Sequence, residues 1–142
     1  MMNSPEISDP CRDRRRRRSD EPEVALGYQL ARVATDFDLE CCVIVDESGH
    51  TVAEASELSS AINSEFANLL PTMSKLPEHR GRFIDQIRRH LPELSDDELS
   101  VCVFRAGGRR LFIGAIGSEA VMNEVAIFRA ITGARRIHNT DQ

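Results

Sequence analysis

The chain lacks any apolar run that approaches the roughly 20 residues needed to cross a bilayer. It also lacks the apolar segment near its start that a signal peptide would need, because Ser4-Pro5-Glu6 and then a series of charged residues follow the first methionines. Both absences argue against a membrane-spanning or exported protein. We therefore expect a soluble protein of the cytoplasm.

No CxxC pair is present, although the chain has four cysteines. These are Cys11, Cys41, Cys42 and Cys102. Neighbouring side chains on a strand point to opposite faces, so Cys41 and Cys42 are poorly placed to share a metal ion or to form a disulfide. The cysteines are expected to be free thiols, packed as small hydrophobic side chains in a reducing compartment.

The sequence also has no basic excess. Its 142 residues carry a formal net charge of −5, whereas nucleic-acid binding through phosphate usually needs a strongly basic surface. Lysine is nearly absent, since Lys75 is the single lysine among 18 basic residues. This preference for arginine indicates a GC-rich genome, which points to a bacterial source.

No catalytic constellation can be assembled from the sequence. The four histidines, His50, His79, His90 and His138, have no neighbouring nucleophile at a useful spacing. Gly114-Ala115-Ile116-Gly117 lacks the Lys-Ser/Thr pair of a phosphate-binding loop, and its small residues instead favour the close approach of a helix or a second subunit. We expect a protein without catalytic residues, cofactor or metal.

Residues 1–22 differ in composition from the rest of the chain. They have almost no apolar residue after Ile7 and cannot offset the entropy of ordering, so a disordered tail is expected. Its cationic spot consists of Arg14, Arg15, Arg16, Arg17 and Arg18. This spot is the one place where the charge pattern allows contact with nucleic acid, acidic lipid or an acidic protein surface.

Residues 23–138 are predicted to form one α+β domain, followed by a short tail at 139–142. Leu26, Leu30 and Val33 recur at helical spacing, and the apolar run Cys41–Val45 predicts a strand covered on both faces. The turn residues Asp46–Gly49 then lead to a second strand over Thr51–Ala55.

A second helix is predicted over Ile62–Met73, kinked or divided near Pro71. A helical insertion follows at residues 76–99, and Gly107-Gly108 predicts a second hairpin. The sheet should be antiparallel, with four to five strands and helices packed on it. A closing helix is expected from Val121, Val125, Phe128 and Thr132, ending at Gly133 or fraying through Arg135-Arg136.

The segment Glu40–Ala55 resembles the opening of a roadblock/dynein light-chain domain, which has an apolar strand, a D-x-x-G turn and a second strand ending in small residues. Ile62–Met73 resembles the central helix of that family, and Leu111–Ile137 resembles its last strand and closing helix. The resemblance covers about residues 24–137 and implies the order α-β-β-α-β-β-α. The family usually has five strands, of which we place four, and the insertion replaces a short link.

A roadblock resemblance implies a non-enzymatic homodimer whose sheets join edge to edge, or whose helices pack, to form a platform for a small Ras-like GTPase or another signalling partner. A GAF-like fold is the alternative, and it implies a small-ligand sensor. The expected partner surface lies around the second hairpin and the closing helix, where arginines suit carboxylates held in a planar, bidentate way. Its residues are Arg105, Arg109, Arg110 and Arg129.

Overall fold

The computed structural model describes residues 10–140 of the chain, with the side chains of residues 22–76 and 78–138. Its helices are α1 (Pro10–Asp36), α2 (Ser60–Lys75), α3 (Arg80–Ile87) and α4 (Ala120–Thr140), with single 3₁₀ turns at Pro77–His79 and Asp96–Glu98. Its strands are β1 (Leu39–Val45), β2 (Thr51–Ser56), β3 (Leu99–Ala106) and β4 (Arg109–Gly117). Within this part of the chain, no helix is long and apolar enough to cross a membrane.

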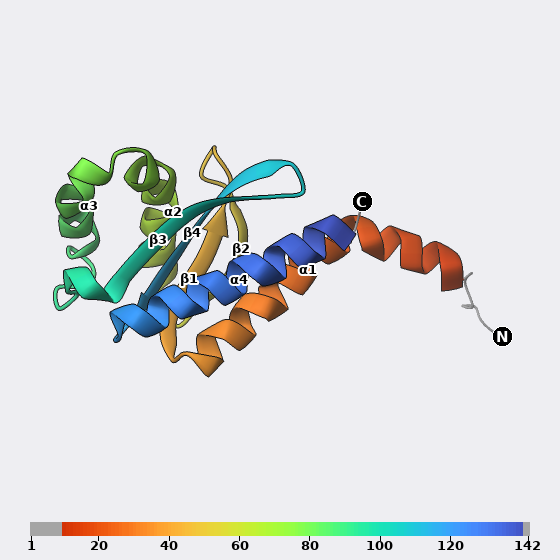
Figure 1. The fold of residues 1–142 in the computed structure, drawn as a ribbon, viewed down its shortest axis with the longest axis horizontal. Coiled ribbons are helices and arrows are strands. Elements are labelled where there is room, and N and C mark those ends of the chain that lie inside the picture. Colours follow the sequence, from red (N-terminus) through yellow and green to blue (C-terminus); the bar gives the residue numbers. More distant parts are fainter. Residues whose placement is uncertain (1–9, 141–142) are drawn as a thin grey trace.

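The four strands form one antiparallel sheet in the order β2-β1-β4-β3. Helices α1 and α4 lie side by side on one face, and α2 with α3 covers the other (Figure 1). The central position of β1 explains its continuous apolar sequence, because both faces of a middle strand are covered. The predicted α+β class, the two hairpins and the four-stranded antiparallel sheet are confirmed.

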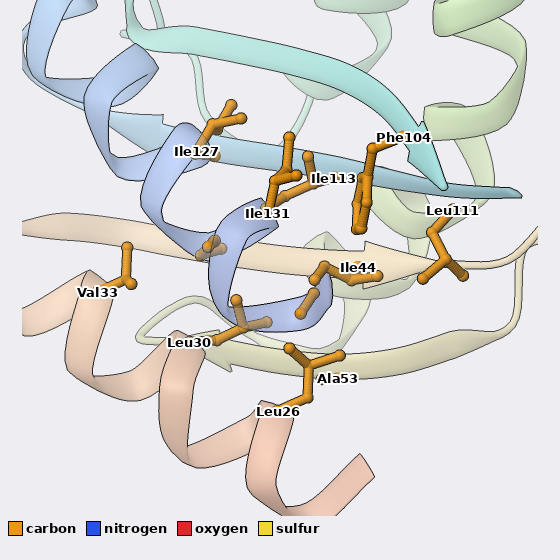
Figure 2. Close-up of a cluster of buried hydrophobic side chains, with 14 of the residues drawn as sticks. Leu26, Leu30, Val33, Ile44, Ala53, Phe104, Leu111, Ile113, Ile127 and Ile131 are labelled. Carbon is orange, nitrogen blue, oxygen red and sulfur yellow. The ribbon is translucent and has the colours of Figure 1, made fainter. Parts of the chain in front are cut away.

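Two hydrophobic cores result, one on each face of the sheet. On the α1/α4 face, Leu26, Leu30 and Val33 are completely buried and reach the sheet beside Ile44 and Ile113 (Figure 2). The opposite face packs Phe66 and Leu70 of α2 against β1 and β4, with α3 at its margin. Cys42 belongs to the first core and Cys41 to the second, so the prediction that they face opposite ways is confirmed.

The face of helix α4 that packs on the core is not the face that carries Val121, Val125 and Phe128. Val121 and Phe128 are each 73% exposed, and Val125 is also exposed. The core side of α4 is formed by Ala126, Ile127, Ala130, Ile131 and Ala134. These small alanines let α4 lie close to the sheet and to α1. The prediction that the helix ends at Gly133 is wrong, because α4 continues to Thr140 and Gly133 itself packs against Gln29 of α1.

Three further expectations are corrected. Residues 10–22 are helical rather than disordered, because arginine and glutamate are good helix formers and a helix docked at Leu26 extends without a new nucleation step. Residues 1–9 lie outside the described part of the chain. Similarly, α4 continues to Thr140 through the expected tail, of which 141–142 are not described. Helix α2 runs through Pro71 without division.

Deleting residues 1–22 is expected to change the melting temperature by no more than a few degrees. The first turns of α1 project beyond the end of α4 (Figure 1), whereas the α1 side chains of the core begin at Leu26. Thermal unfolding followed by circular dichroism compares the full chain with the truncated one. A larger loss would show that residues 1–22 dock on the domain.

Candidate functional site

The turn end of the β3–β4 hairpin gathers basic side chains from four elements, β3, β4, α2 and α4. Gly107 and Gly108 have φ values of 60° and 77°, a conformation in which a two-residue turn joins strands with the normal twist. This turn places Arg105 directly opposite Arg110. Cross-strand neighbours share one face of a sheet, so their guanidinium groups leave the sheet together.

A hollow of about 490 Å³ lies at this end of the sheet, and four of its lining side chains are cationic. They are Lys75, Arg105, Arg110 and Arg135. Ser74 also lines the hollow, and its hydroxyl is buried without a hydrogen-bond partner. A concave surface with several cations and a free hydroxyl favours a carboxylate or phosphate group.

Two of the arginines lie next to acidic residues of the β1–β2 turn. Arg109 approaches Asp46 at 3.8 Å, and Arg110 approaches Glu47 at 3.9 Å. These distances are too long for hydrogen bonds, and exposed ion pairs of this kind contribute only about 0–1 kcal/mol. Acidic groups of a partner therefore compete readily for both arginines.

Asp46 itself is held by the turn. Its Oδ1 accepts hydrogen bonds from the backbone N–H groups of Ser48 and His50, both at 3.0 Å, and from the Ser48 hydroxyl at 2.8 Å. Burial acts to raise the pKa of Asp46, but these hydrogen bonds together outweigh it and lower the pKa below its usual value. The carboxylate thus stays charged and fixes the turn against which Arg109 lies.

Arg129 does not belong to this cluster. It lies on α4, where its Nη1 is 3.3 Å from Oδ2 of Asp36 and its guanidinium stacks over the ring of Phe37 at 4.9 Å. The structure therefore brings together Arg105 and Arg110 from the predicted set, places Arg109 at the neighbouring turn and separates Arg129. Lys75 and Arg135 are the residues that sequence reasoning missed.

The structure also shows a groove between β3 and α4. It is lined by apolar side chains, including Val101, Ile127 and Phe128, with Arg80 and Glu124 at its rim. This groove runs along the strand that ends the sheet.

Among residues 10–140, no group of three or more potential ligands is placed to hold a metal ion. Burial raises the pKa of the Cys41 thiol to about 12, and it also raises that of Cys42. Both thiols are therefore protonated near neutral pH and are poor nucleophiles.

Comparison with known proteins gives one informative result. No protein-family model matches the chain, and neither does any curated protein. Among solved structures, the chain is similar to Myxococcus xanthus MglB, with a TM-score of 0.57 over 84% of this chain and 92% of that one. The chain has a roadblock-like fold. Sequence identity over the match is 12%, so the likeness concerns the fold alone.

The roadblock-like fold fits the described elements in their order along the chain. It differs from the usual five-stranded form in having four strands within residues 10–140, with α3 and its flanking turns between α2 and β3. Helix α3 and the two 3₁₀ turns lie within residues 76–99, the segment where a helical insertion was predicted. The comparisons give no support to a GAF-like sensor.

Proposed function

We propose that this chain is a non-enzymatic regulatory module of the bacterial cytoplasm that works as a homodimeric platform for a small Ras-like GTPase. The roadblock-like fold supports this reading, because the resemblance to that family implies such a platform. The chemistry of the site agrees with it, since the described residues offer a basic surface that suits acidic groups of a partner.

The observation that carries the proposal is the basic end of the β3–β4 hairpin. Arg109 and Arg110 are held there only by long, exposed ion pairs, so they can exchange their present neighbours for acidic side chains of the GTPase. Arginine is well suited to this contact because its planar fork binds a carboxylate in a bidentate way. Arg129 offers a second, separate contact on the α4 side.

Reversing both charges in the variant Arg109→Glu/Arg110→Glu is expected to weaken GTPase binding by roughly tenfold or more. Titration calorimetry with the purified Ras-like GTPase of the source organism measures this. The matched control is Arg82→Glu/Arg89→Glu, which makes the same charge change at exposed positions around α3.

The control variant should bind as the unchanged chain does, and all three proteins should give the same circular-dichroism spectrum. If Arg109→Glu/Arg110→Glu bound the GTPase as tightly as the unchanged chain does, the proposed contact would be contradicted. Equal loss of affinity in both double variants would show that only the overall charge matters.

A further inference from the structure

The hollow at the turn end of the β3–β4 hairpin carries positive charge that the protein does not balance. None of the described residues that line it is acidic, although the whole chain has a formal net charge of −5. Among the described side chains, the one carboxylate that forms an ion pair with the four cations is Glu47, at 3.9 Å from Arg110. The cations are Lys75, Arg105, Arg110 and Arg135.

Two of these arginines face each other across the hairpin. Ala106 and Arg109 close the two-residue turn, so Arg105 and Arg110 form the next, non-hydrogen-bonded pair, in which side chains come closest. Like charges directly opposite each other on one face destabilise a sheet. The Arg105 side chain has no ion pair or hydrogen bond with any other described residue that would offset this cost. An anion bound between the two guanidinium groups would remove the repulsion.

The other polar groups of the hollow are donors that lack acceptors. The Nε of Arg135 donates to the backbone carbonyl of Arg105 at 3.1 Å, which fixes the guanidinium plane and leaves its Nη groups for another acceptor. Lys75, at the end of α2, is exposed and has no ion pair with a described residue, and the buried hydroxyl of Ser74 beside it has no hydrogen-bond partner. Donors on several sides suit a group with many acceptor oxygens.

Charge and size favour a chain of phosphates over a single carboxylate. A carboxylate carries one negative charge, whereas a phosphate ester carries about −1.5 to −2 at neutral pH and has three acceptor oxygens. Two linked phosphates therefore approach the charge of the four cations. The hollow of about 490 Å³ has room for them and for part of a larger molecule, because small-molecule sites typically have about 300–1,000 Å³.

We propose that this hollow is a binding site for a small molecule that carries a diphosphate group. Arg105 and Arg110 hold one phosphate between them, and Lys75 with Arg135 holds the other. Val103, which is 47% exposed in the lining, offers apolar surface to the rest of an organic diphosphate. The inference goes beyond the proposed GTPase platform and does not depend on it, since Arg110 alone is shared with that contact.

Titration calorimetry of the full chain with inorganic pyrophosphate in magnesium-free buffer tests the site. We expect a Kd of about 1–100 µM. Arg105→Gln and Lys75→Gln should each weaken binding by roughly tenfold or more, because each removes a charged donor. The matched control is Arg82→Gln, which removes one positive charge from an exposed position of α3 and should bind as the unchanged chain does. These variants leave Arg110 in place.

Thermal unfolding gives a readout that a merely structural role of Arg105 would not give. Without pyrophosphate, Arg105→Gln should melt no lower than the unchanged chain, because it removes a pair of like charges. Pyrophosphate at about 100 times its Kd should raise the melting temperature of the unchanged chain and raise that of the variant much less. A variant that melts clearly lower without pyrophosphate would contradict the proposal, because Arg105 would then serve the stability of the sheet.

A comparison of pyrophosphate with ADP distinguishes an inorganic from an organic source of the diphosphate. Tighter binding of ADP supports an organic diphosphate whose remaining part lies on Val103, and tighter binding of pyrophosphate supports the inorganic ion. If a phosphoserine peptide binds at least about tenfold more tightly than both, the occupant is a phosphorylated protein and the small-molecule assignment is overturned.

Absence of binding up to about 1 mM pyrophosphate would overturn the proposal. Equal affinity for citrate would do the same, since citrate carries several negative charges but no phosphate. An affinity for pyrophosphate that is unchanged in both Arg105→Gln and Lys75→Gln would place the ion outside the hollow. GTPase binding is measured separately, so failure of the diphosphate site does not imply failure of the proposed function.

Discussion

Replacing Ala130 by Asp is expected to unfold the domain at temperatures where the unchanged chain is folded. Ala130 is completely buried between α4 and the sheet, and an isolated carboxylate there loses its hydration without gaining a partner. A cost of about 4 kcal/mol or more is expected, which is a large share of the 5–15 kcal/mol that stabilises a typical domain.

Val121→Asp is the matched control on the same helix. Val121 belongs to the apolar stripe that marks α4 in the sequence, but it is 73% exposed and lies in the first turn, where a negative charge is tolerated or favourable. Its melting temperature should stay within a few degrees of the unchanged value. If Val121→Asp lowered the melting temperature more than Ala130→Asp does, α4 would pack on the core with the face that carries Val121, which would contradict the structure.

Replacing Gly114 by Val is the second substitution with a large expected effect. A Cβ at Gly114 would lie 2.5 Å from Cζ of Phe66 and 2.7 Å from Cδ2 of Leu70, both fully buried side chains of α2. Since neither side chain can move into free space, the overpacked core should lose about 1–3 kcal/mol or more. Urea unfolding monitored by circular dichroism gives the value.

A double variant shows whether that loss of stability comes from the contact with Phe66 or from a general intolerance of β4 to a larger side chain at this position. Phe66→Ala alone should cost about 3–5 kcal/mol, because it leaves a cavity against Gly114. In the double variant Gly114→Val/Phe66→Ala, the new side chain occupies that space, so the combined loss should be clearly less than the sum. Strict additivity would contradict the contact between β4 and α2.

Much of this fold follows from local sequence pattern. The run Cys41–Val45 has only one reasonable place, in the middle of a sheet, and Gly107-Gly108 between two alternating segments specifies a hairpin. The small residues from Gly114 were expected to allow a helix to approach, and α2 does so. The helices and the two hairpins were therefore accessible from residues close together in the sequence, whereas the strand order depends on the pairing of β1 with the distant β4 and was not predicted.

Where prediction failed, the deciding contact was distant in sequence. The large apolar residues of α4 mark a stripe on the outer side, but packing against α1 requires small residues, so alanines form the buried face. The extension of α1 to Pro10 depends on a helix already docked through Leu26 rather than on apolar content of the tail. Neither effect is visible in a short window of sequence.

The candidate site shows the same limit. Arg105 and Arg110 are paired by the hairpin, and their proximity follows from the turn. Lys75 comes from the end of α2 and Arg135 from α4, more than 20 residues away on either side, so only the folded chain brings them to the same hollow. Arg129 was grouped with them by charge, but α4 carries it to Asp36 and Phe37 instead.

Titration of the full chain with the purified Ras-like GTPase of its source organism, loaded in turn with GDP and with a non-hydrolysable GTP analogue, tests the central claim most directly. A regulatory platform should bind, and it should distinguish the two nucleotide states by at least about tenfold in Kd, a difference of about 1.4 kcal/mol. Absence of binding in both states at concentrations where the chain is folded would contradict the account.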